Sequence, residues 1–254
     1  MRIAAVSPHL DDAAMSASVR LAAAGATVLT VFTALPPAGL EASWWDRLTG
    51  ATSSAARQRE RIEEDHAAMQ LLGTRAVHLG APDAQYRAGA PDLDHAVERM
   101  TREFADCDQV WLPSAIGGHR DHRAARDAGL RAAVAAGHAE VVLYADFPYV
   151  VAFGWPSWVT GEPADPYVDA SFWLDDQIRA VGLDVGALTP EVIRLNAEQR
   201  QRKAAVIAAY RTQAPVLRLS PADLAREPGK LDYELAWRMS LTGPPSPRNS
   251  PSGD

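Results

Sequence analysis

The chain has 254 residues, carries a formal net charge of −7, and 47% of its residues are hydrophobic. This length is enough for one large α/β domain with a substantial core, and we expect a single domain over residues 1–242. The acidic balance and the lack of a run of Lys and Arg exclude a basic patch for nucleic acid or for an anionic membrane. No apolar run approaches the length of a membrane span, and the first apolar run is too short for a signal peptide. We therefore expect a cytoplasmic protein without membrane insertion.

The single cysteine, Cys107, leaves no intramolecular disulfide framework and no cysteine-rich zinc site. A bound metal ion would therefore need histidine and carboxylate ligands. Composition does not decide the oligomeric state, and it leaves a homo-oligomer open.

Short apolar runs alternate with alanine-rich helical patterns along the chain, and this alternation predicts βαβ units and a parallel sheet. We expect strands at residues 2–7, 27–33, 75–80, 109–113 and 140–146, and helices at 12–24, 54–72, 92–105, 120–136 and 189–210. Gly25, Gly73 and Gly137 follow three of these helical patterns, where a left-handed residue commonly ends a helix.

A right-handed, doubly wound sheet made from these units takes the strand order 3-2-1-4-5, with helices on both faces. The first and fourth strands are then neighbours, and ligands of such folds bind in the crevice beyond the carboxyl ends of these strands. Residues 150–186 contain several Trp and Pro residues and receive no assignment. The tail, residues 243–254, is rich in Pro, Ser and Gly and is predicted to be disordered.

Two polar clusters follow the first and fourth predicted strands. The first cluster is His9-Leu10-Asp11-Asp12, and the second contains His119, Asp121 and His122. The predicted topology brings both clusters to one crevice, although they lie far apart in the sequence. Adjacent carboxylates at the end of a buried strand repel each other and are costly to desolvate, so we expect a cation beside them.

One carboxylate and two imidazoles can form a three-ligand zinc site, which leaves the fourth position for a water molecule whose pKa falls to about 7. One of Asp11 and Asp12 can ligate while the other serves as general base. Likewise, one of His119 and His122 can ligate while the other faces the developing oxyanion. The residues alone do not decide either choice, and Fe²⁺ suits the same ligand set as Zn²⁺.

Helix capping is the alternative interpretation of both clusters. Asp11 or Asp12 could cap the helix after the first strand, and Asp121 could cap the helix after the fourth. The joint placement of the clusters at the predicted reversal point of the sheet favours the metal site.

The motifs PHLDD and HRDH resemble the hallmarks of the PIG-L/LmbE-like family of zinc-dependent de-N-acetylases, which are AHPDDE and a later HxxH. The resemblance continues through RIEEDHAAMQLLG, YADFPY and KAAVIAAYRTQ, and it covers nearly the whole chain except the tail. Two positions depart from the family pattern, because Leu10 replaces its proline and Ala13 replaces its final glutamate. Neither position is a required ligand in the metal-site interpretation.

The resemblance implies a Rossmann-like fold and hydrolysis of the N-acetyl group of an amino sugar, such as N-acetylglucosamine in a glycoside, glycolipid or natural-product conjugate. It implies that His9, Asp12 and His122 ligate zinc. It also implies that Asp11 is the general base and that His119 stabilises the oxyanion or protonates the amine. The partner would be the small acetylated amino sugar or its conjugate.

Substrate contacts are expected from the predicted helix 54–72 and from loops beyond the second, third and fifth strands. Polar side chains there can hydrogen-bond sugar hydroxyls, and aromatic rings can stack on a sugar face. The candidates are Arg61, Asp83, Tyr86, Arg87, Trp44 and Asp146. In the alternative interpretation, Arg61 forms only an exposed helical pair with Glu64, and Trp44 and Trp45 pack onto the domain as a lid of its core.

Three other functions compete with deacetylation of an amino sugar. An amidase acting on a sugar-thiol conjugate or another amide would use the same chemistry, and the sequence does not separate the two. A sugar-binding module without turnover would have no use for Asp11. A nucleotide-binding protein is disfavoured, since no G-x-G-x-x-G motif follows the first strand.

Overall fold

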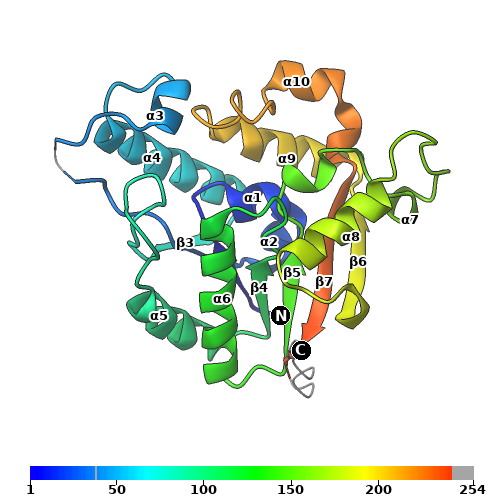
Figure 1. The fold of residues 1–254 in the computed structure, drawn as a ribbon, viewed down its shortest axis with the longest axis horizontal. Coiled ribbons are helices and arrows are strands. Elements are labelled where there is room, and N and C mark those ends of the chain that lie inside the picture. The colour runs from blue at the N-terminus through cyan, green and yellow to red at the C-terminus, as the bar shows by residue number, and fades with distance from the viewer. Residues whose placement is uncertain (38, 242–254) are drawn as a thin grey trace, which may run out of the picture.

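The computed structural model describes residues 1–37 and 39–241 and contains a seven-stranded sheet with helices on both faces (Figure 1). Its first five strands are β1 (Ile3–Ser7), β2 (Thr27–Thr30), β3 (Arg75–His78), β4 (Gln109–Pro113) and β5 (Glu140–Tyr144). They pair in parallel in the order β3-β2-β1-β4-β5, which confirms the predicted order. The predicted disorder of residues 243–254 lies outside the described residues.

All four helices predicted between these strands have counterparts in the structure, the first of them as two pieces. They are α1 (Asp12–Ser16), α2 (Ser18–Ala24), α4 (Ser54–Leu72), α5 (Asp94–Phe104) and α6 (Arg120–Ala135). The bounds predicted for the helix 54–72 are confirmed, whereas the predicted helix 12–24 is broken at Ala17. Gly25 and Gly73 end α2 and α4 with φ of 57° and 66°, the left-handed conformation expected there.

Strand β1 is buried on both of its faces. Ile3 and Ala5 pack into the core layer that contains residues of α2 and α4, while Ala4 and Val6 pack into the layer beneath α5 and α6. Side chains alternate between the two faces of a strand, so an uninterrupted apolar run is what a strand between two helical layers requires. The turn that follows β1 therefore starts from a fixed point in the middle of the sheet.

Two antiparallel strands complete the sheet beyond β5 in the order β5-β7-β6. The predicted helix 189–210 is wrong at its start, because residues Leu188–Arg194 form β6 and α9 covers only Ala197–Ala209. Strand β6 lies at the sheet edge and is half exposed, so the spacing of its apolar residues resembles part of a helical face. Asn196 and Gln199 form a capping box at the true start of α9. The central partner, β7 (Tyr233–Ser240), was not predicted.

The region 150–186, which had no assignment, contains α7 (Ser157–Thr160) and α8 (Ala170–Ala180), with 3₁₀ turns at Tyr149–Val151 and Val185–Ala187. Short helices also form at α3 (Trp44–Leu48) and α10 (Pro221–Arg226), and a third 3₁₀ turn spans Pro228–Leu231. Among the helices of the described residues, none combines the length and the apolar character needed to span a membrane.

A buried ion pair joins α9 to β7. Lys203 is 1% exposed, and its Nζ lies 3.2 Å from Oε1 of Glu234. Glu234 also accepts hydrogen bonds from the Ser18 hydroxyl at 2.8 Å and from the Val19 N–H at 3.2 Å, at the start of α2. Burial lowers the pKa of Lys203, although Glu234 acts in the opposite direction. The pair thus fixes α9 against both α2 and the sheet.

Replacing Lys203 with Met should destabilise the fold strongly, because Glu234 then remains buried without a counter-charge. Removing one partner of a buried pair costs about 3–5 kcal/mol, and the free energy of unfolding from urea titration would measure the loss. The double variant Lys203→Met/Glu234→Gln removes the stranded charge and should recover most of this stability. A Lys203→Met protein within about 1 kcal/mol of wild type would contradict the role of the pair.

Candidate active site

The turn after β1 carries His9, Asp11 and Asp12. Ser7 organises this turn, because its hydroxyl donates to the His9 carbonyl and accepts from the Ala13 N–H at 3.0 Å. Asp11 stands at the N-cap position of α1, but its side chain makes no capping hydrogen bond. The Asp12 carboxylate instead accepts from the backbone N–H of His9 at 2.7 Å. Helix capping therefore does not account for the two aspartates.

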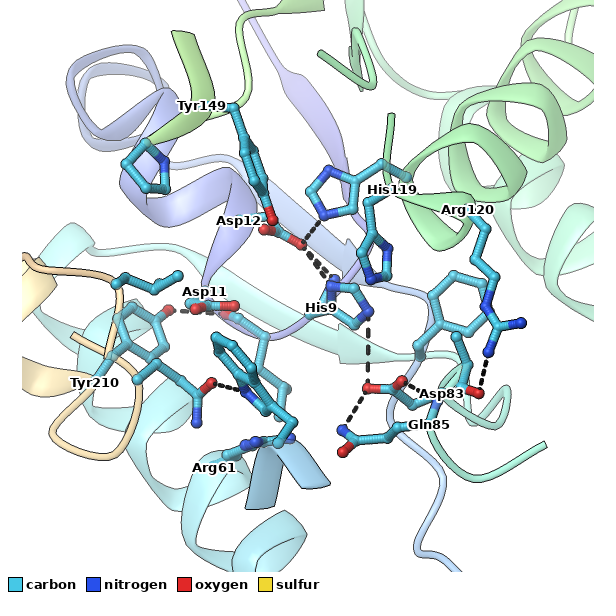
Figure 2. A pocket seen from close by; sticks show the side chains of 18 of the residues that line it. His9, Asp11, Asp12, Arg61, Asp83, Gln85, His119, Arg120, Tyr149 and Tyr210 are labelled. Carbon is cyan, nitrogen blue, oxygen red and sulfur yellow. Dashed lines mark hydrogen bonds and ion pairs between the residues drawn. The ribbon is translucent and has the colours of Figure 1, made fainter. Parts of the chain in front are cut away.

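The start of α6 lies beside this turn because β4 pairs in parallel with β1. His119 is the N-cap residue of α6, and its Nδ1 accepts from the Asp121 N–H at 3.2 Å. His122 lies in the first turn of the helix and is 1% exposed. Gly117 allows close packing here, since a Cβ at this residue would lie 2.7 Å from Cδ1 of Tyr149. The structure thus brings the two polar clusters together, as Figure 2 shows.

Asp12 lies between two imidazoles. Its Oδ2 is 3.1 Å from Nδ1 of His9 and 3.3 Å from Nε2 of His122. In a tetrahedral zinc site, bonds of about 2.0–2.2 Å place neighbouring ligand atoms about 3.3 Å apart. Oδ2 of Asp12 therefore lies at the spacing of neighbouring ligands from one nitrogen of each imidazole. A set of two imidazoles and one carboxylate suits Zn²⁺ or Fe²⁺.

The far nitrogen of each of these imidazoles faces a buried carboxylate. Nδ1 of His122 is 2.7 Å from Oδ1 of Asp146, and Nε2 of His9 is 3.3 Å from Oδ2 of Asp121. Both carboxylates are almost completely buried. A ligand histidine commonly donates its second N–H to such a carboxylate, which fixes the tautomer and strengthens the metal-binding nitrogen. In the described residues, no carboxylate hydrogen-bonds the ring of His119, which favours His9 and His122 as ligands.

Among the described residues, two groups of three side chains bring ligand atoms close enough together to hold a cation. The ring nitrogens of His9, His119 and His122 lie within 4.8 Å of one another, and so do donor atoms of His9, Asp83 and Asp121. In the second group, Asp121 already forms an ion pair with Arg87 and accepts from the Ala84 N–H at 2.8 Å. Its charge is therefore already compensated by the protein.

The two adjacent aspartates differ in their electrostatic surroundings. Burial, and then the charge of Asp12, raise the pKa of Asp11 to about 6. Burial acts in the same direction on Asp12, but the imidazoles of His122 and His9 outweigh it and hold the pKa of Asp12 below its usual range. Adjacent carboxyl groups with divergent pKa values are typical of sites that divide roles between them.

His119 is a neutral imidazole near pH 7. Burial, followed by the nearby rings of His9 and His122, lowers its pKa to about 4. Because Nδ1 accepts the N–H of Asp121, the ring proton resides on Nε2. His119 can therefore donate a hydrogen bond from Nε2.

A cavity of about 440 Å³ opens over these side chains. Its aromatic walls include Trp44 and Trp45 on one segment and Phe147 and Tyr149 on another. In Figure 2, Asp11 lies on the side of Tyr210, whereas Asp12 lies on the side of Tyr149. The polar residues that line the cavity are His9, Asp11, Asp12, Gln58, Arg61, Asp83, Gln85, His119, Arg120, His122 and Gln213.

Three of the predicted substrate contacts, Arg61, Asp83 and Trp44, line the cavity. The alternative that Arg61 forms only an exposed pair with Glu64 is wrong, since Arg61 is buried and its Nη2 lies 3.0 Å from Oδ1 of Asp46. Trp44 is 68% exposed at the rim, so it is not a lid of the core.

The other three predicted contacts do not line the cavity. The Tyr86 hydroxyl donates to Oδ2 of Asp46 at 2.8 Å, and Arg87 pairs with Asp121. Asp146, which we expected to contact substrate, instead lies behind His122. Asp146 contacts the His122 ring directly, whereas Arg87 and Tyr86 act one contact further away, through Asp121 beside His9 and through Asp46 beside Arg61.

Several residues of the site were missed in the sequence. Asp121 was visible within HRDH but was interpreted only as a helix cap. Tyr210 and Gln213 stand in the segment KAAVIAAYRTQ, which marked the family resemblance without indicating a role. Nothing in the local pattern indicates that they reach the cavity, because their contacts depend on how α9 packs.

The fold and the site define a doubly wound α/β protein with a histidine- and carboxylate-lined cavity at the carboxyl ends of its parallel strands. The family model of PIG-L, described as GlcNAc-PI de-N-acetylase, matches residues 4–133. This match includes both polar clusters and about half of the chain. The protein belongs to the PIG-L family.

Individual relatives resemble the chain over different lengths. A 2′-N-acetylparomamine deacetylase of Streptomyces fradiae is 36% identical over 167 residues, which are 57% of this chain and 56% of that protein. The chain thus spans little more than half the length of this curated relative. The structure of an A40926 pseudoaglycone deacetylase is similar with a TM-score of 0.69, at 29% identity over 96% of this chain and 99% of that one. A triple mutant of a deacetylase of the teicoplanin biosynthetic pathway also has a TM-score of 0.69, at 26% identity over 96% and 100%.

Replacing Asp146 with Asn should weaken zinc binding about 10–100-fold, because a neutral amide polarises the His122 ring less than a carboxylate does. Competition with a chromogenic chelator would measure the affinity. Asp127→Asn makes the same change on an exposed carboxylate of α6 and should leave the affinity unchanged. Equal affinities of the Asp146→Asn and Asp127→Asn proteins would argue against a carboxylate–histidine–metal arrangement.

Proposed function

We propose that this protein is a zinc-dependent N-deacetylase that releases acetate from an N-acetylated amino sugar in a natural-product conjugate. The observation that carries the proposal is the convergence of Asp12 with His9 and His122 beside a second carboxylate, Asp11, in one cavity. Membership of the PIG-L family supports this reaction. The names of the relatives, which refer to N-acetylparomamine and to teicoplanin biosynthesis, support an antibiotic-type amino sugar as substrate.

His9, Asp12 and His122 would hold the metal ion. A zinc ion bound there supplies a Lewis acid that polarises the amide carbonyl and lowers the pKa of a water molecule. Asp121 and Asp146 hold the two imidazoles in the orientation that presents one ring nitrogen of each toward Asp12.

Asp11 is the carboxylate left free for proton transfer. It lines the cavity, and its oxygens are not needed as metal ligands when Asp12 takes that role. Asp11 accepts a proton from the attacking water as the new C–O bond forms, and it returns that proton to the nitrogen as the C–N bond breaks. The products are acetic acid and the amine; transfer of the acid's proton to the amine gives acetate and an ammonium group, and Asp11 is again a free carboxylate.

His119 is the donor for the amide oxygen. Its ring lies 5.1 Å from the ring of His9 and 5.2 Å from that of His122, between centroids. Its neutral form carries the proton on Nε2, so it can donate to the oxygen on which negative charge develops. A donor that is already oriented before the reaction stabilises this charge without reorganisation.

The walls of the cavity would bind the sugar. Trp44 and Trp45 offer aromatic faces for the apolar face of a sugar ring, while Arg61 and Asp83 can hydrogen-bond its hydroxyls. The cavity volume of about 440 Å³ suits one sugar residue with part of the group attached to it.

Substitution of the two adjacent aspartates should separate their roles. We expect Asp11→Asn to keep about one zinc per chain while turnover falls at least about 100-fold, since the base is removed and the ligands remain. We expect Asp12→Ala to lose both the metal and the activity. Elemental analysis and initial rates on the same preparations would test this, and equal loss of metal in both variants would mean that the roles are assigned wrongly.

The substrate class can be tested with a small panel of amides. We expect the zinc-loaded protein to release acetate from 2′-N-acetylparomamine or from a teicoplanin-type N-acetylglucosaminyl conjugate faster than from the simple amide N-acetylethanolamine. The difference would reflect contacts of the sugar with the cavity walls. Enzymatic measurement of acetate would follow the reaction. A zinc-loaded protein that cleaves none of the sugar amides would contradict the proposed function.

A further inference from the structure

We propose that the segment Tyr210–Gln213, directly after α9, is a positioning element that holds the turn carrying Asp11 and the wall carrying Trp45 around the same cavity. In this proposal, Tyr210 acts on the turn and Gln213 acts on the wall. The kinetic part of the inference rests on the proposed function, whereas the structural part stands without it.

Tyr210 is hydrogen-bonded to the turn between a proposed ligand and the proposed base. It is 1% exposed, and its hydroxyl lies 2.9 Å from the carbonyl oxygen of Leu10. Leu10 stands between His9 and Asp11, so this contact fixes the peptide from which the Asp11 side chain leaves the turn. Figure 2 shows the Tyr210 ring directly beside Asp11.

Helix α4 holds Tyr210 in this place from the other side. Oδ1 of Asp65 lies 3.3 Å from the Tyr210 hydroxyl, and Oδ2 of Asp65 lies 2.7 Å from Nε2 of His78. Asp65 is completely buried. The single hydroxyl proton therefore has two acceptors, one in the turn after β1 and one in α4.

Gln213 is hydrogen-bonded to the aromatic wall. It is 6% exposed, and its Oε1 accepts from Nε1–H of Trp45 at 2.9 Å. An indole nitrogen can only donate, so the orientation of the Gln213 amide is fixed. The amide nitrogen then donates to Oγ1 of Thr212 at 3.0 Å, and this hydroxyl donates to Glu64 of α4 at 2.8 Å.

The two ends of this short segment thus touch two different parts of the site while its middle is tied to α4. The turn that carries Asp11 acts on proton transfer, and a misplacement of a reacting group by about 1 Å can cost about 100-fold in rate. The wall that carries Trp45 binds the sugar in the ground state and in the transition state alike, so its disturbance raises KM. Loss of the Tyr210 contact should therefore lower kcat, and loss of the Gln213 contact should raise KM.

Hydrogen exchange read by mass spectrometry tests the structural part on the zinc-loaded protein without substrate. We expect Tyr210→Phe, which keeps the ring, to accelerate exchange about tenfold in peptides covering residues 8–14, and to leave residues 42–48 unchanged. We expect the reverse for Gln213→Leu. Tyr167→Phe and Gln201→Leu, at exposed positions, serve as matched controls that should alter neither segment.

The kinetic part uses the best substrate among the sugar amides of the panel. We expect Tyr210→Phe to lower kcat about 10–100-fold per bound zinc with KM within about twofold, and Gln213→Leu to raise KM about 5–10-fold with kcat within about twofold. If both variants only lower the unfolding temperature and accelerate exchange throughout the chain, or if neither changes its own segment, the inference is overturned. A wild-type protein without turnover would instead count against the proposed function and would leave the exchange test valid.

Discussion

Strand β1 is apolar from Ile3 to Val6 and buried on both faces, so the turn that follows it carries Asp11 and Asp12 into the interior of the protein. Two adjacent carboxylates in such a place are costly unless each has a compensating partner. Asp12 has the imidazoles of His9 and His122 at 3.1 and 3.3 Å, whereas burial raises the pKa of Asp11 to about 6. A cation at Asp12 would offset the repulsion between the two carboxylates and would leave Asp11 free to accept and donate protons.

Other residues support the site around Asp11 and Asp12, some through direct contacts with its imidazoles and some from further away. Asp121 from α6 and Asp146 from the segment after β5 orient the two imidazoles, so the ends of three adjacent parallel strands contribute to one site. The C-terminal part of the chain contributes differently, since Tyr210 and Gln213 contact the turn and the aromatic wall from outside. The ends of β1, β4 and β5 thus carry the proposed ligands and the proposed base, and in our proposal the segment after α9 holds these parts in place.

The parallel half of the fold was predictable because its signals are local and mutually consistent. Continuous apolar runs identified β1 and β4, and the rules of right-handed connection then placed His9 beside His122 without any contact information. Strand β6 was not predictable in this way, because an exposed edge strand presents a weak pattern that merges with the helical pattern of α9. The capping box at Asn196 and Gln199 was the local signal that could have separated them.

The sequence could predict a site residue only where an unusual side chain stands at the end of a strand that the topology places beside the crevice. The two polar clusters could be selected because such side chains are unusual at the ends of buried strands. The choice of His9, Asp12 and His122 as ligands within these clusters came from the family resemblance. Asp146 was predicted to contact substrate, but its carboxylate lies behind His122. The neighbouring sequence does not reveal this orientation. Tyr210 and Gln213 depend on the packing of α9 against α4 and α1, which is a long-range property of the whole chain. Family membership supports the proposed chemistry, whereas the substrate depends on cavity walls that also contain residues outside the family motifs, such as Trp44 and Trp45.

The location of the metal ion tests the central claim most directly. Crystals of the zinc-loaded protein, with anomalous diffraction measured on both sides of the zinc absorption edge, would place the ion without reference to activity. We expect one strong peak within bonding distance of His9, Asp12 and His122, with the carboxylate of Asp11 outside the coordination sphere. A peak held by His119 in place of Asp12, or by Asp83 and Asp121, would contradict the division of roles on which the proposed chemistry depends.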